Sequence, residues 1–127
     1  MHIHTHGIRI DLSRIGEKVF VEFVLLGKLT HEDYETFVPM IEHAVKGLPP
    51  RSLNILIDMR RFEGWTPKAA WDDFKFGLEL RDDIEKMAVV GDKTWEALFT
   101  GMAGWMISGQ AKFFESVEEA RRWLTNP

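Results

Sequence analysis

Histidines with the spacing of metal ligands stand at the start of the chain. His2, His4 and His6 alternate with other residues, and alternate residues of a β-strand project from one face of the sheet. Imidazole nitrogens bind zinc and other transition metals, so such a face could chelate one of these ions. However, the sequence places no fourth ligand beside them, and chain ends are commonly frayed or solvated. We therefore predict no metal site and no cofactor.

Adjacent carboxylates are the second group with potential chemistry. These pairs are Glu32 with Asp33, Asp72 with Asp73, and Asp82 with Asp83. General acid–base catalysis needs groups that converge on one substrate, whereas adjacent helical residues point about 100° apart. Such pairs are typical of solvated helix faces and of first helical turns, where the helix dipole favours negative charge.

Nucleophiles and nucleotide-binding motifs are missing from the sequence. Ser13, Ser52, Ser108 and Ser116 stand in no G-x-S-x-G phrase, and there is neither a P-loop nor a G-x-G-x-x-G phrase. The absence of cysteine excludes disulfides and thiolate chemistry. We therefore predict that the protein is not an enzyme.

The segment Trp95–Ile107, WEALFTGMAGWMI, carries a single charge, at Glu96. On a helix its large apolar side chains form one broad stripe, made of Trp95, Leu98, Phe99, Met102, Trp105 and Met106. A helix without a charged back must be buried on both sides or meet an apolar partner. Gly101 and Gly104 each cost about 1 kcal/mol in a helix interior, so we predict a mobile, partly accessible segment.

Composition describes an ordinary globular protein and limits its partners. The 127 residues, of which 45% are hydrophobic and 28% charged, predict one domain spanning 1–127. A net charge of −4 argues against nucleic acid as the main partner. The N-terminus lacks a signal-peptide pattern, and no stretch approaches the roughly 18 uncharged residues of a membrane span. We therefore predict a cytoplasmic protein.

The elements begin with strands. Alternating Ile3, Ile8 and Ile10 predict a first strand, followed by a turn at Ser13–Gly16. The second strand, Lys18–Leu26, is apolar on both faces, which is typical of the interior of a sheet. Further strands are expected at Leu53–Asp58, Ile84–Val90 and Ala111–Phe114.

Helices are predicted between these strands. Thr30 caps a helix that runs to Lys46, with a kink expected at Pro39. Thr66 and Pro67 start the next helix as N-cap and first helical residue. Its main apolar stripe consists of Ala70, Trp71, Phe74 and Leu78. A second stripe, about 180° away around the helix, consists of Phe76 and Leu80. Ser116 and Glu119 form a capping box for the last helix.

Alternating strands and helices predict the α/β class. We expect one domain with a mostly parallel sheet of four or five strands, four helices, and an antiparallel N-terminal edge strand that is reached by a short turn.

Several phrases in this order resemble the SpoIIAA-like branch of the STAS superfamily. They are GKLTHEDY at Gly27–Tyr34, VPMIE at Val38–Glu42, LID at Leu56–Asp58, EGW at Glu63–Trp65, the phrase A-x-W-D-D-x-K-F-G at Ala69–Gly77, and E-A-x-x-W-L at Glu119–Leu124. The resemblance implies a STAS-like fold, which is shared with lipid carriers of the CRAL-TRIO type. It also implies an apolar pocket and peripheral membrane association.

Anti-anti-sigma members of the superfamily carry a phosphorylatable serine in a D-S-[ST]-G phrase after the third strand. Here the region reads DMRRFEGWTPKAAW, and Thr66 is its only hydroxyl group. Helix capping is a sufficient role for Thr66, so the resemblance does not extend to this phospho-switch.

Two functions follow from these expectations. The first is the binding of a nonpolar or lipid-like ligand, in a groove between the second and third helices. Its candidate residues are Trp65, Trp71, Phe76, Leu80, Trp95, Phe99, Met102, Trp105 and Met106. The alternative is a regulatory STAS-type module that uses the same apolar surface as an interface with a second copy or with another protein.

Overall fold

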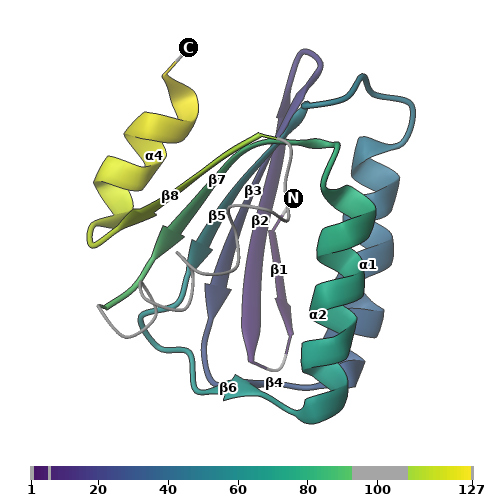
Figure 1. Ribbon diagram of the computed structural model, residues 1–127, viewed down its shortest axis with the longest axis vertical. Coiled ribbons are helices and arrows are strands. Elements are labelled where there is room, and N and C mark those ends of the chain that lie inside the picture. Colours follow the sequence, from purple (N-terminus) through teal and green to yellow (C-terminus); the bar gives the residue numbers. More distant parts are fainter. Residues whose placement is uncertain (1, 6, 93–108, 127) are drawn as a thin grey trace.

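A six-stranded mixed sheet forms the centre of the protein (Figure 1). The computed structural model describes residues 2–5, 7–92 and 109–126. The strands lie side by side in the order β1-β2-β3-β5-β7-β8. Their bounds are His2–Thr5 (β1), Ile8–Ile15 (β2), Lys18–Leu25 (β3), Leu53–Asp58 (β5), Ile84–Val90 (β7) and Gln110–Phe114 (β8).

The type of strand pairing changes once across the sheet, from antiparallel to parallel. β1, β2 and β3 are antiparallel neighbours, whereas β3, β5, β7 and β8 are parallel. The predicted α/β class with an antiparallel N-terminal edge is therefore confirmed. The predicted number of four or five strands is wrong, because the first strand is a hairpin of two. Gly7, with φ of 75°, belongs to the turn between them. β2 also runs through the predicted turn at Ser13–Gly16, and the chain reverses at Gly16, with φ of 62°.

Three described helices cover the two faces of the sheet. α1 (His31–Val45) and α2 (Pro67–Leu80) pack on one face, and α4 (Val117–Thr125) lies on the other (Figure 1). The fourth helix predicted at Trp95–Ile107, with its predicted mobility, falls outside the described residues. α1 is continuous across Pro39, and the bend expected there stays a prediction. None of the described helices is long and apolar enough to cross a membrane.

The predicted caps of all three helices are present. Thr30 and Asp33 form a complete capping box, in which the Thr30 amide donates to Asp33 Oδ2 over 2.8 Å. Thr66 accepts from the amide of Ala69, and Ser116 accepts from the amide of Glu119. For α4 the structure thus shows the serine half of the expected box. Each cap satisfies a backbone donor that the helix itself leaves unpaired.

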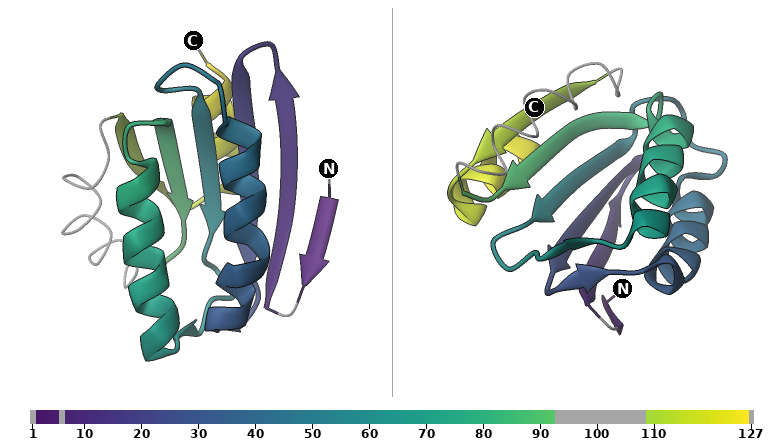
Figure 2. Two further views of the ribbon diagram at one scale, coloured as in Figure 1. Left: turned by 90° about the vertical axis from the view of Figure 1, so that its right-hand side faces the viewer. Right: turned by 60° about the horizontal axis from the view of Figure 1, so that its bottom comes forward.

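A small second sheet positions the candidate site. β4 (Lys28–Leu29) pairs in parallel with β6 (Gly64–Trp65), at the end of the molecule where α1 and α2 begin (Figure 2). The amide of Thr66 donates to the carbonyl of Leu29 over 2.9 Å. Because Thr30 and Thr66 directly follow the paired residues, the N-termini of α1 and α2 are held side by side.

Two apolar clusters form the core. The larger cluster lies between the sheet and helices α1 and α2, and it includes Val21, Phe37, Leu53 and Leu80. The smaller cluster joins α4 to the opposite face through Leu56, Ala88, Val90, Phe114, Ala120 and Leu124. Burial of each large side chain contributes about 1.5–3 kcal/mol, so these clusters fix which face of each helix points inward.

Candidate functional site

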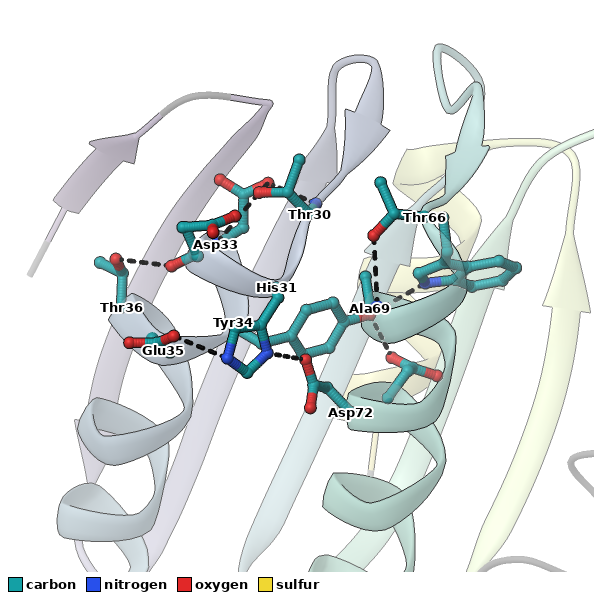
Figure 3. Close-up of polar contacts among 12 residues, drawn as sticks. Thr30, His31, Asp33, Tyr34, Glu35, Thr36, Thr66, Ala69 and Asp72 are labelled. Atoms are coloured by element: carbon teal, nitrogen blue, oxygen red, sulfur yellow. Dashed lines mark hydrogen bonds and ion pairs between the residues drawn. The ribbon is translucent and has the colours of Figure 1, made fainter.

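A polar cluster connects the first turns of α1 and α2 (Figure 3). His31 of α1 lies between two carboxylates, one from each helix. Its Nε2 is 2.6 Å from Glu35 Oε1, and its Nδ1 contacts Asp72 Oδ2. The side chain of Asp72 is only 13% exposed. These contacts tie α2 to α1 through charged groups.

The buried Tyr34 adds a second connection beside His31. Its hydroxyl donates to Asp73 Oδ1 over 2.7 Å and accepts from Trp65 Nε1 over 2.9 Å. Burial, and then the charge of Asp73, raise the pKa of Tyr34 well above its ordinary value. The phenol therefore stays neutral and can donate. Desolvation also raises the pKa of Asp73, whose carboxyl lies against the core although the residue keeps solvent access. The hydrogen bond from Tyr34 opposes this shift.

The polar groups of this cluster bind one another and hold the two helices together. His31, Tyr34 and Trp65 use their polar atoms on neighbouring side chains. Within the described part of the chain, no group of His, Cys, Asp or Glu side chains is arranged to hold a metal ion. His2 and His4 lie on β1 in register with Asp11 and Arg9, but their side chains and all of His6 lie outside the described residues.

The residues predicted to line an apolar groove are placed in different surroundings. Phe76 packs edge-on against Phe37 with ring centroids 5.8 Å apart, and Leu80 is buried in the core. Trp65 contacts Phe62 and donates to Tyr34, whereas Trp71 is 59% exposed. The remaining candidates, Trp95, Phe99, Met102, Trp105 and Met106, fall outside the described residues. The four described candidates therefore do not form one surface.

The larger apolar stripe of α2 faces outward, and the smaller one faces the core. Ala69 and Leu80 are buried, and Phe76 packs on the core, whereas Trp71 and Leu78 are exposed. The predicted main stripe is thus the outer one, and the second stripe packs inward. The inward spacing includes Asp73, which sequence reasoning counts as a solvated residue. Asp73 is exposed in the structure, and its carboxylate also accepts from the hydroxyl of Tyr34.

The exposed face of α2 is the most apolar helix surface in the described residues. Trp71 and Phe74 stack with their ring centroids 5.9 Å apart and their planes inclined by 24°. Leu78 follows one turn later and is 38% exposed. We call Trp71, Phe74 and Leu78 the α2 outer stripe. The sequence predicted these residues as part of the main apolar stripe of this helix, with Trp71 among the candidates for an apolar groove.

A charged edge lies at the C-terminal end of β5. Arg60 donates to both carboxylate oxygens of Asp58, through Nε over 2.9 Å and Nη2 over 2.7 Å. Burial by itself would raise the pKa of Asp58, but the hydrogen bonds and charge of Arg60 hold the pKa below its usual value. Arg60 also lines a shallow polar hollow with Glu115, Ser116, Val117, Glu118 and Arg121.

Replacing Arg60 with alanine is expected to destabilise the protein by about 1 kcal/mol at neutral pH, because Asp58 stays buried without its partner while Arg60 itself is largely exposed. In the wild type the stability from Asp58 is complete above the unfolded pKa of about 3.9 and is lost as pH falls through the lower folded pKa. The difference between the two proteins should therefore shrink in acid. Urea unfolding across this pH range measures it. Arg61→Ala is the control, and an equal loss in both variants would contradict the assignment.

Comparisons with known proteins identify relatives with this fold. The SpoIIAA-like family model matches residues 20–125. This chain belongs to the SpoIIAA-like family. An uncharacterised Shewanella loihica protein of the DUF3478 family, with a SpoIIAA-like fold, is 36% identical, with 98% of each chain covered and a TM-score of 0.81. No curated protein matches the sequence.

More distant solved structures share the fold of this SpoIIAA-like chain. Unphosphorylated SpoIIAA, described as an anti-sigma factor antagonist, covers 93% of this chain and 99% of its own at 15% identity, with a TM-score of 0.59. Phosphorylated SpoIIAA, described as a Bacillus cell fate determinant, covers 90% and 97% at 18% identity, with a TM-score of 0.58. Between β5 and α2 this SpoIIAA-like chain has no D-S-[ST]-G phrase, and Asp58 at the end of β5 pairs instead with Arg60.

Proposed function

We propose that this protein is a non-enzymatic protein-interaction module of the regulatory STAS type, and that the α2 outer stripe is its contact surface. The observation that carries the proposal is the exposure of Trp71, at 59%, beside a half-buried Phe74 and an exposed Leu78. Tryptophan is enriched among the residues that contribute most to protein–protein binding. An apolar stripe on an otherwise charged helix face is typical of such a surface.

The polar cluster under α2 supports this role. His31 contacts Asp72, and Tyr34 donates to Asp73, on the side of the helix turned away from the outer stripe. These contacts hold α2 in one position before a partner arrives. A surface that is already ordered loses less conformational entropy on binding, so more of its contact energy appears as affinity.

The described fold favours a protein partner over a nonpolar ligand. Phe76 and Leu80, which were expected to border an apolar groove, are used by the core. One structural neighbour is by its description an antagonist of an anti-sigma factor, which is itself a protein. Binding of a lipid-like ligand depends on the candidates between Trp95 and Met106 and stays a prediction.

Photo-crosslinking in the source cells tests the proposal. A benzophenone amino acid replaces Leu78 in one variant and Ile15, which is 67% exposed on the β2–β3 hairpin, in a matched control. We expect discrete protein adducts at position 78, either with this chain or with another protein, that disappear when Trp71→Ala is added. Equal adduct formation at positions 78 and 15, or adducts with lipid only, would overturn the proposal.

A further inference from the structure

The α2 outer stripe has a nearly symmetric arrangement of residues along the helix. Trp71 and Leu78 lie on either side of a midpoint between Phe74 and Lys75. Exposed Lys68 and Glu79 flank the same stripe, and their midpoint falls one residue earlier. Residues 68 and 79 are 11 positions apart, about three helical turns, so they lie on the same side of the stripe. On this side the apolar stripe therefore has a basic residue toward its N-terminal end and an acidic residue toward its C-terminal end.

We propose that the occupant of this surface is a second copy of the chain, with the two α2 helices antiparallel across a two-fold axis near Phe74 and Lys75. This inference rests on the proposed function and names its partner. An isologous contact requires a patch that is complementary to itself when reversed. Reversal of this stripe places Trp71 against Leu78 of the second copy and brings the two Phe74 rings to the centre.

The charges select the antiparallel direction. In this arrangement Lys68 of each copy faces Glu79 of the other, so two opposite-charge pairs form at the rim. In a parallel pairing the same residues of the two copies would lie on opposite sides of the seam, and no opposite-charge pair would form. Interfacial charges act mainly on register and orientation, and like charges in contact disfavour a pairing.

The contact is expected to be weak and reversible. α2 has 14 residues and is therefore about 21 Å long. One pair of such helices buries less than the roughly 800 Å² per partner of a standard interface. Lys75 lies on the outer side of α2 close to the axis, where the lysines of the two copies repel one another. Lys75→Gln is therefore expected to tighten the association.

Sedimentation over a wide range of protein concentrations tests the dimer. The wild type should convert from monomer to dimer as its concentration rises. Trp71→Ala should weaken dimerisation at least about tenfold, whereas Ile15→Ala should leave it unchanged. Lys68→Glu should also weaken the dimer, and the exchange of both charges, Lys68→Glu with Glu79→Lys, should restore it. Monomeric wild type at every concentration, or no response to these exchanges, would overturn the inference.

Cysteine crosslinking tests the direction of the helices, because the native chain contains no cysteine. With a short bismaleimide, Lys75→Cys should crosslink to itself. Lys68→Cys should not, since its symmetry mates lie about 20 Å apart along the helices, but Lys68→Cys combined with Glu79→Cys should crosslink. Efficient crosslinking of Lys68→Cys alone would overturn the antiparallel arrangement.

If the protein is monomeric but position 78 crosslinks to another protein, this inference fails and the proposed function stands. If position 78 gives no specific adduct either, both fail.

Discussion

Gly109→Ala is expected to destabilise the protein by about 3 kcal/mol, the upper part of the usual range for overpacking. A Cβ atom at this position would lie 2.2 Å from the carbonyl oxygen of Glu85 and 2.4 Å from that of Ile84. Both oxygens belong to the backbone at the start of β7, so no side-chain rotation relieves the contact. The backbone of β7 or of the segment before β8 must move instead.

That movement would affect one whole edge of the sheet. β8 pairs with β7 from Lys86 and Gln110 onward, and the same Lys86 donates to the carbonyls of Trp123 and Asn126 at the end of α4. A shift at Gly109 therefore disturbs both the edge strand and the docking of α4.

Urea unfolding of Gly109→Ala and of a matched glycine variant measures the effect. Gly16→Ala is the control, because nothing lies within 4 Å of its Cβ position and only its φ of 62° opposes alanine. A left-handed residue costs about 1–2 kcal/mol, so the Gly109 variant should be clearly less stable. Equal stability of the two variants would show that the β7 backbone adjusts without cost.

Tyr34→Phe is expected to lower the free energy of unfolding by about 2 kcal/mol. The substitution keeps the ring in its packing place but removes the donor to Asp73 and the acceptor for Trp65 Nε1. Both partners are then left without this hydrogen bond at a site where Tyr34 is only 2% exposed. An unsatisfied buried polar group costs about 1–3 kcal/mol.

A double-mutant cycle with Trp65→Phe assigns that loss to the hydrogen bond. Residues in one network are expected to show a coupling energy of at least about 0.5 kcal/mol. If the two losses simply add, the hydroxyl does not connect α1 to β6 energetically. Trp71→Phe, on the outer side of α2, serves as the uncoupled control.

The ionisation of Tyr34 gives a second measurement, because the chain has a single tyrosine. Its folded pKa is raised, so its contribution to stability is complete below the unfolded pKa of about 10 and is lost as pH rises toward the folded value. The phenolate absorbance should therefore appear only as the protein unfolds in alkali. Titration near the ordinary value in a folded protein would contradict the buried geometry.

The sequence by itself determined the features that depend on neighbouring residues. Thr30, Thr66 and Ser116 predicted the starts of α1, α2 and α4, because a cap is a hydrogen bond within one turn. Continuous apolar runs predicted β3, β5 and β7, because a strand that is covered on both faces does not alternate between polar and apolar residues. Their order along the chain predicted the α/β class and the antiparallel edge.

The candidate site depended instead on groups that are distant in the sequence. The sequence did not show which stripe of α2 faces the core, nor that Asp73 accepts from Tyr34, because these two residues are 39 positions apart. Pairing of β4 with β6 brings those two segments together, and both strands are too short to show periodicity. Apolar side chains at helical spacing establish that a helix has an apolar face. Only tertiary packing decides whether that face is buried, as for Phe76 and Leu80, or exposed, as for Trp71, because burial depends on which polar groups find partners elsewhere in the fold.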